Sequence, residues 1–331
     1  WHKSLFMYHS SILFIFFIGS LFLLSCEKEF DPETTFDGPQ LVVEGYIQVG
    51  PNALPPYVLL TKSVEYSSSI NSGTLNDLFV HDAEVRISDG DSSIILQELC
   101  ISDLSVLPPL LQEAISQALG LPPIDSVALD ICVYTNIFAA VGIGLNIASG
   151  RRYDLEIVAQ GFDTLRSSTE IPMPVPIDSL SYANHPGYPN FDSLVEVLAH
   201  FKDPLGPNYY RSYSQRNDEP MYPSGTRGTN GSVSDDNIFE GQSFSFGILR
   251  GQDPFDDFDF DTFGYFWRGD TVVVRAASID YAHFRFWQTL EFNTGSQGPF
   301  GTYTRIESNI EGGMGIWGGI SYNDYQIIIP E

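Results

Sequence analysis

The sequence has few cysteines, few basic residues and no familiar catalytic signature. Three cysteines in 331 residues are too few for a scaffold held together mainly by disulfides. The 16 Lys and Arg residues stand against 42 Asp and Glu, which gives a formal net charge of −26 at pH 7. Because such a surface repels phosphate groups, nucleic acid is not an expected partner. No His-Glu-x-x-His or Gly-x-Ser-x-Gly segment occurs, so the sequence predicts neither a common zinc protease nor a common serine hydrolase.

The residues that are abundant favour a globular, mostly β protein. Hydrophobic residues make up 43% of the chain, and its length is enough for two ordinary domains with packed cores. Aromatic residues reach 14%, and such side chains suit half-buried sheet surfaces. The 29 Gly and 21 Pro provide the frequent turns that a β protein needs.

The N-terminus has the pattern of an export signal. An almost continuous apolar run at residues 12–24 follows Lys3 and ends just before Cys26. The run is short for a membrane-spanning helix, and its flanks are those of a signal peptide. We expect residues 1–25 to be a lipoprotein signal peptide, and Cys26, which ends a Leu-Leu-Ser-Cys sequence resembling the bacterial lipobox, to carry the lipid anchor. Residues 26–39 would form a polar tether. The alternative is an uncleaved N-terminal helix with an incidental cysteine.

The two remaining cysteines, Cys100 and Cys132, form an even pair in a chain that we expect to be exported. The sequence therefore predicts a disulfide between them, with two buried free thiols as the alternative. Neither a Cys-x-x-Cys motif nor a histidine close in sequence accompanies them, which argues against a metal or redox site.

Short alternating segments separated by turn signals predict a β-sandwich in the first half of the chain. Within it lies an insertion at residues 101–124, in which apolar residues recur at helical spacing between Pro108-Pro109 and Gly120 with Pro122-Pro123, predicting a helix. This helix would be a lid packed on the sandwich or, alternatively, would bind a partner. The predicted strands are residues 41–47, 57–63, 83–89, 94–96, 152–159 and 164–169.

Alternating prolines at residues 171–177 enforce an extended segment and mark the best domain boundary. We expect an N-terminal β-sandwich domain at 40–172 and a C-terminal β-rich domain at 173–331. In the second domain, spacing predicts a helix over 278–291 with Ser278 as its cap. The predicted strands are residues 192–201, 208–213, 242–247, 270–276, 312–319 and 325–329.

Several segments carry a resemblance to a known family: residues 41–47, 59–63, 83–89, 153–157, 171–180, 208–211 and 308–319. In this order they resemble the Bacteroidota lipoproteins called domain of unknown function 4249, over essentially all of residues 26–331. The resemblance implies an outer-membrane lipoprotein with an immunoglobulin-like or transthyretin-like N-terminal β-domain and a β-rich C-terminal domain. It also implies an accessory of TonB-dependent outer-membrane transporters, and it transfers no catalytic residue. The acidic residues after Cys26 resemble the family's surface-export signals.

One acidic segment is a candidate cation site. Asp257, Asp259 and Asp261 alternate with phenylalanines, which would place three carboxylates on one side of a strand, where calcium could bind. The EF-hand pattern fails, because Thr262 and Arg268 occupy its glycine and glutamate positions. The alternative is an edge strand guarded by solvated charge. No other cofactor is expected.

Exposed aromatic residues are a second source of candidate binding residues. Tyr209 and Tyr210 lie in a tyrosine-rich segment, and Trp317 lies within a glycine-rich one. Aromatic faces stack on sugars and anchor protein partners, although the alternative is a place in the core.

The sequence thus predicts a non-enzymatic lipoprotein, anchored in the outer membrane and facing the cell surface. It would be an accessory or ligand-capture partner of a TonB-dependent transporter. One alternative is a structural or adhesive module of the cell envelope. Another is a hydrolase that uses two carboxylates distant in sequence, as glycoside hydrolases do.

Overall fold

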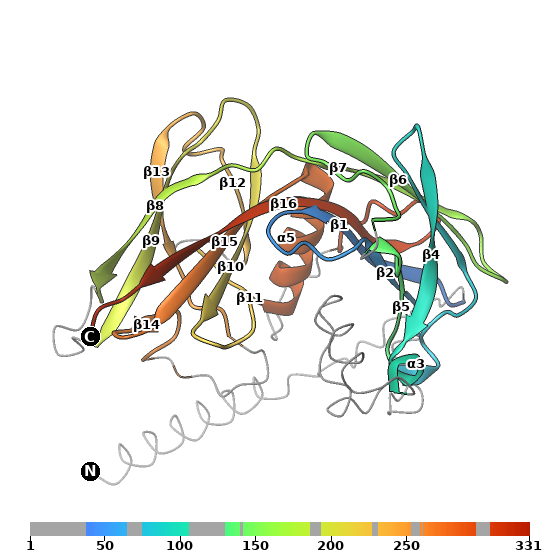
Figure 1. Ribbon diagram of the computed structural model, residues 1–331, viewed down its shortest axis with the longest axis horizontal. Helices are drawn as coiled ribbons and strands as arrows, with labels where there is room; N and C mark the ends of the chain where they lie inside the picture. Colours follow the sequence, from blue (N-terminus) through green and yellow to red (C-terminus); the bar gives the residue numbers. More distant parts are fainter. Residues whose placement is uncertain are drawn as a thin grey trace, which may run out of the picture. The chain divides into compact units, whose positions relative to one another are not determined.

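We describe the protein from a computed structural model (Figure 1). The described strands and helices lie in the unit Pro39–Glu331, and this described part of the chain is mostly β, as the sequence predicts. No helix within it is long and apolar enough to cross a membrane. The structure describes residues 38–64, 75–105, 130–139, 142–185, 193–226, 231–252, 259, 261–295 and 305–331.

A 12-stranded sheet contains strands from both halves of the described chain. Its order is β11-β10-β15-β16-β1-β2-β5-β4-β3-β6-β7, and β12 also pairs with β10. The strands are β1 (Leu41–Val49), β2 (Tyr57–Lys62), β3 (Glu84–Ser88), β4 (Ser93–Cys100), β5 (Cys132–Thr135), β6 (Arg151–Val158), β7 (Leu165–Ile171), β10 (Tyr209–Arg216), β11 (Tyr222–Pro223), β12 (Val233–Asp235), β15 (Thr271–Ile279) and β16 (Met314–Ile328).

In the first half of the chain this sheet folds back on itself, so that β7 lies against β16 (Figure 1). The backbones of Arg166 and Glu311 form an isolated antiparallel bridge there, and the amide of Gly319 donates a 2.7 Å hydrogen bond to Thr169 Oγ1. Alternate side chains of β6 are buried, as its sequence pattern predicts. The enclosed core consists of Leu41, Val43, Ile47, Val58, Leu60, Val85, Ile87, Leu96, Tyr134, Tyr153, Leu155, Ile157, Ala159, Leu165, Ile171, Ile310 and Trp317.

Both faces of β16 are buried over residues 315–322. Trp317 belongs to the first core, whereas Ile316 and Ile320 pack on the opposite face, against the core below the helix α5 (Tyr281–Gly295). A strand covered on both faces carries apolar or small residues at consecutive positions, not alternating ones. Gly318 is one of the small residues, because a Cβ there would lie 2.6 Å from Nδ1 of His283 on the helix.

A second, 4-stranded sheet packs in the other half of the chain. It contains β8 (Ile177–Asn184), β9 (Leu194–Lys202), β13 (Ser243–Ile248) and β14 (Phe266–Trp267), with β9 in contact with the other three. Its apolar face packs on β15 and on the C-terminal end of β16 in the large sheet. The shared core consists of Ile177, Val195, Val197, Ala199, Ile248, Phe266, Val272, Val274 and Ile329.

The helix α5 begins at Tyr281, two residues later than a cap at Ser278 would place its first helical residue. Ser278 is part of β15, and its Oγ accepts a hydrogen bond from the amide of Val175. The cap is Asp280: its Oδ1 accepts a 2.8 Å hydrogen bond from the amide of His283, three residues on. The same carboxylate accepts a bond from Thr169 Oγ1, so that one side chain both caps the helix and holds it against β7. The expected cap at Ser278 is therefore wrong, although the helix itself is confirmed.

Most predicted strands are present with ends shifted by a few residues. The segments 312–319 and 325–329, expected as separate strands, belong to the single strand β16. Through its parallel pairing with β1, β16 joins residues 314–321 to 42–49, so the regions 40–172 and 173–331 share one sheet. Of the expected insertion at 101–124, the helix α3 (Ile101–Ser105) is described, and the rest lies outside the described residues.

Gly319 should tolerate no larger side chain. A Cβ at this position would lie 2.4 Å from the carbonyl oxygen of Glu170, which is fixed in β7. We expect Gly319→Ala to lower the free energy of unfolding by about 3 kcal/mol, measured by urea denaturation. Gly161→Asn is the control, since nothing lies within 4 Å of the added atom and asparagine tolerates the φ of 85°. Equal losses in the two variants would contradict the close packing of β7 on β16.

Candidate functional site

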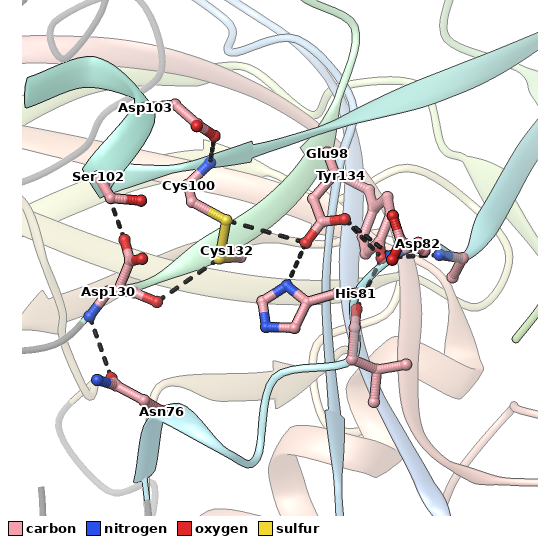
Figure 2. Close-up of a disulfide and its surroundings, with 12 residues drawn as sticks. Asn76, His81, Asp82, Glu98, Cys100, Ser102, Asp103, Asp130, Cys132 and Tyr134 are labelled. Atoms are coloured by element: carbon pink, nitrogen blue, oxygen red, sulfur yellow. Dashed lines mark hydrogen bonds and ion pairs between the residues drawn. A yellow bond between two sulfur atoms is a disulfide. The ribbon is translucent and has the colours of Figure 1, made fainter. Parts of the chain in front are cut away.

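A disulfide lies at one end of the first half, where β4 ends and β5 begins (Figure 2). Cys100 and Cys132 are register partners on these antiparallel strands, with their Cα atoms 4.0 Å apart and their sulfurs bonded. The disulfide predicted from the cysteine count is therefore present. We call the region around it, with His81, Glu98 and Tyr134, the disulfide corner.

Glu98 organises the disulfide corner. Its Oε1 lies 2.5 Å from Nδ1 of His81 and 3.8 Å from the sulfur of Cys100 (Figure 2). Its Oε2 accepts a 2.9 Å hydrogen bond from the amide of Asp82, a residue with a positive φ of 56°. The Tyr134 hydroxyl lies 3.4 Å from the same oxygen, and burial together with Glu98 raises the pKa of Tyr134 to about 12. The carboxylate thus holds the 81–82 turn beside the disulfide.

Three chain segments meet on the other side of the disulfide. The amide of Cys100 donates to Asp103 Oδ2 at 3.0 Å, and the amide of Ser102 donates to Asp130 Oδ1 at 2.8 Å. The amide of Asp130 in turn donates to the side chain of Asn76 at 3.1 Å. Residues before β3, after β4 and before β5 are therefore fixed to one another around the disulfide (Figure 2).

A histidine does lie beside the two cysteines, although none is close to them in sequence. Among the described residues, one group of His, Cys, Asp or Glu side chains could share a metal ion, and it consists of His81, Glu98, Cys100 and Cys132. His81 is 19 positions from Cys100 in sequence, but the antiparallel pairing of β3 with β4 returns the preceding turn to the end of β4. Proximity along the chain could not reveal this histidine.

A second feature of the same half is a loop that presents apolar side chains to solvent. Asn136 follows β5 directly, and its side chain donates to the Ile143 carbonyl at 2.7 Å and accepts from the Phe138 amide at 3.1 Å. Ile137, Phe138 and Ile143 are nevertheless 45%, 47% and 61% exposed. We call these three side chains the apolar end loop.

An open cleft of about 820 Å³ lies beside the apolar end loop. The turn between β1 and β2 forms one wall, and the chain on either side of residue 143 forms the other. Contributing residues are Gln48, Asn52, Ala53, Leu54, Pro55, Pro56, Ile94, Asn136, Ala139, Gly142, Ile143, Gly144, Leu145 and Ile147. Among the described residues of this lining there is no histidine or carboxylate.

Comparison with known protein families matches residues 27–326 to the family described as "Domain of unknown function (DUF4249)". The chain belongs to the DUF4249 family. The family membership expected from the separate segments is thereby confirmed. No curated protein sequence matches the chain significantly. The family description names no chemistry, so the evidence for a function of this DUF4249 protein lies in its own residues.

The proposed calcium ligands of the DUF4249 chain are described only in part. Asp257 lies outside the described residues. Asp259 is exposed, and its carboxylate accepts hydrogen bonds from the Asp261 amide and the Thr262 hydroxyl, both at 3.0 Å. Residues 261–264 form a turn, so the strand expected to align Asp259 with Asp261 is wrong at this point. The alternating sequence gave no sign that the first aspartate would bond to the backbone two residues later.

The candidate aromatic residues of the DUF4249 chain are mostly internal. Trp317 has no exposed surface, and its Nε1 donates to the carbonyl of Tyr153. Tyr210 is also buried, and its hydroxyl donates to Asp203. Tyr209 is half-buried and stacks on Phe284 of α5, with the ring centroids 5.1 Å apart. These rings hold the core and the helix, so in this structure Trp317 and Tyr210 offer no face to a ligand.

Sequence reasoning missed a buried cation under α5. The Arg211 side chain is 5% exposed and lies 3.5 Å from the centroid of the Trp287 ring. It donates to Ser232 and forms a 3.8 Å ion pair with Glu291. A desolvated guanidinium is tolerated because an aromatic face and a carboxylate both compensate its charge. Arginine in a strand is ordinarily exposed, so the sequence carries no signal for this arrangement.

Removing the disulfide should cost stability. Replacing Cys100 and Cys132 together by Ala is expected to lower the free energy of unfolding by about 3–4 kcal/mol. The two cysteines are 32 positions apart, and without the bond the unfolded chain is no longer constrained by the loop between them. Urea denaturation measures the difference. Phosphine reduction of the unmodified chain should give the same loss. A double variant as stable as the oxidised parent would contradict the expectation that the bond stabilises the fold by reducing the conformational entropy of the unfolded chain.

His283 should make the DUF4249 protein sensitive to acid. The ring is fully buried between α5 and β16, and burial, reinforced by Arg211, lowers its pKa from 6.5 to about 3. Below pH 6.5 the unfolded chain binds a proton on this ring that the folded chain does not, so this group lowers stability as the pH falls toward 3.

The variant His283→Leu removes that proton uptake. Its stability relative to the parent should improve by up to about 1.4 kcal/mol per pH unit as the pH falls from 6 to 4. Urea denaturation at several pH values measures this trend. His200→Asn is the matched control at a partly exposed histidine. A His283→Leu difference that is constant across this range would contradict the buried neutral ring.

Proposed function

We propose that this protein is a non-enzymatic outer-membrane lipoprotein, anchored through Cys26, facing the cell surface and acting as an accessory or ligand-capture partner of a TonB-dependent transporter. The apolar run before Cys26 supports export, and the lipobox-like sequence supports the anchor. The resemblance to the DUF4249 lipoproteins supports the transporter as the partner. No cofactor is part of the proposal.

The observation that carries the proposal is the apolar end loop. Three large apolar side chains gather in one short loop, although a strongly acidic protein would gain solubility from polar residues there. Clustered exposed apolar groups mark interaction sites, whereas single ones are ordinary. The hydrogen bonds of Asn136 hold the Phe138 amide and the Ile143 carbonyl, so less conformational entropy is lost at these two residues when a partner packs on them. The cleft beside it gives a partner a concave surface.

Copurification from native membranes tests the proposal. We expect the native lipoprotein, extracted in mild detergent, to bring down a large outer-membrane barrel. The double variant Phe138→Asp, Ile143→Asp should reduce that yield at least tenfold, because two charges would have to be desolvated at the contact. Leu205→Asp is the matched control, since Leu205 is 88% exposed on another loop and should leave the yield unchanged.

Three outcomes would contradict the proposal. One is a clean monomer in the extract, and another is an equal loss with the Leu205→Asp control. The third is an absence of lipid on the purified protein, which would remove the anchor at Cys26. If deletion of the chain weakened the envelope or attachment and left transport unchanged, the structural or adhesive alternative would replace the transporter partnership.

A further inference from the structure

The disulfide corner holds the donor set of a zinc site with its two sulfurs joined to each other. One ligand atom from each of His81, Glu98, Cys100 and Cys132 can be chosen so that all lie within 4.8 Å of one another. Two thiolates, an imidazole nitrogen and a carboxylate oxygen are ligands that a tetrahedral zinc ion accepts. While the disulfide is intact, neither sulfur is a thiolate, so the set is incomplete.

We propose that reduction of the Cys100–Cys132 disulfide opens a binding site for a thiophilic divalent cation, best suited to zinc, with His81 and Glu98 completing the coordination. The inference concerns the disulfide corner alone and does not depend on the proposed transporter partnership.

The backbone holds these donors close together whether or not the sulfurs are bonded. The residues of Cys100 and Cys132 are paired within the β4–β5 ladder, which also joins Leu99 to Val133 and Glu98 to Tyr134. Oε2 of Glu98 is engaged by the Asp82 amide, which leaves Oε1 directed at His81 and the sulfurs. A site that is already assembled loses little entropy when the ion binds.

The movements needed for coordination are small. At ordinary bond lengths of about 2.0–2.3 Å, tetrahedral ligand atoms lie roughly 3.3–3.8 Å apart. His81 Nδ1 and Glu98 Oε1 are 2.5 Å apart, so they must separate by about 1 Å for the cation to replace the shared proton. The His81 side chain is 53% exposed, which gives it room to move and gives the ion access from solvent.

The chemistry balances with a dithiol as the reductant. A thiolate of the dithiol attacks one sulfur of the disulfide and forms a mixed disulfide, which the second thiolate then resolves. Two electrons pass to the sulfurs of Cys100 and Cys132, two protons follow, and the dithiol leaves as its own disulfide. Binding of the divalent cation then releases the two thiol protons to solvent.

Cobalt titration tests the proposal on the full chain carrying Cys26→Ser, in which Cys100 and Cys132 are the remaining cysteines. After anaerobic reduction and removal of the reductant, we expect one Co²⁺ per chain. The bound ion should show thiolate-to-cobalt charge-transfer bands and the intense visible bands of a tetrahedral site, and one equivalent of Zn²⁺ should abolish them. The oxidised chain should show neither.

Variants then identify the two remaining ligands. In the reduced chain, His81→Ala and Glu98→Gln should each weaken Co²⁺ binding at least tenfold, whereas His200→Ala, whose ring bonds to Ser181 and Ser245, should leave it unchanged. No binding by the reduced chain, equal binding by the oxidised chain, or full affinity in both ligand variants would overturn the proposal. Circular dichroism on the same samples completes the test. A reduced chain that loses its sheet signal and does not regain it with Co²⁺ also overturns the proposal.

Discussion

The insertion of β16 between β15 and β1 is the constraint on which the rest of the structure depends. This strand pairs antiparallel with β15 and parallel with β1, so it links the last residues of the chain to the first described strand. Its side chains enter the first core on one face and the core beneath α5 on the other. Close neighbours on both faces restrict Gly318 and Gly319 to hydrogen as a side chain. Neither core is complete until this strand is in place, which makes folding dependent on contacts of long sequence separation.

Helix α5 fits onto this sheet through polar contacts as well as apolar ones. Asp280 caps the helix and accepts a bond from β7, while Arg211 on β10 lies against Trp287 and Glu291 of the helix. His283 contributes a neutral ring where Gly318 leaves space. These polar groups add directional contacts to the apolar packing of the helix on the sheet. The cost is a buried charge and a buried ring that must remain unprotonated.

Local pattern was sufficient to predict most strands and the helix, because alternation and helical spacing are properties of neighbouring residues. It could not predict which strands pair. The parallel pairing of Val42 with Met314 brings together residues far apart in sequence, and neither segment specifies the other. For the same reason the sequence did not show that His81 lies near Cys100, or that Ser278 pairs with Ser321 in the sheet and so cannot cap the helix. The disulfide was predictable because only two cysteines remained once Cys26 had been assigned to the lipid.

The disulfide corner and the apolar end loop share one short strand. β5 begins at Cys132 and ends at Thr135, and Asn136, which fixes the loop, follows at once. Only Tyr134 and Thr135 of this strand pair with β2, so most of its register is set by β4 and by the disulfide. A covalent bond at one end of a four-residue strand restricts the position of the other end, since the backbone between them is extended and paired. The apolar end loop therefore follows a strand that the ladder with β4 and the disulfide both hold in place.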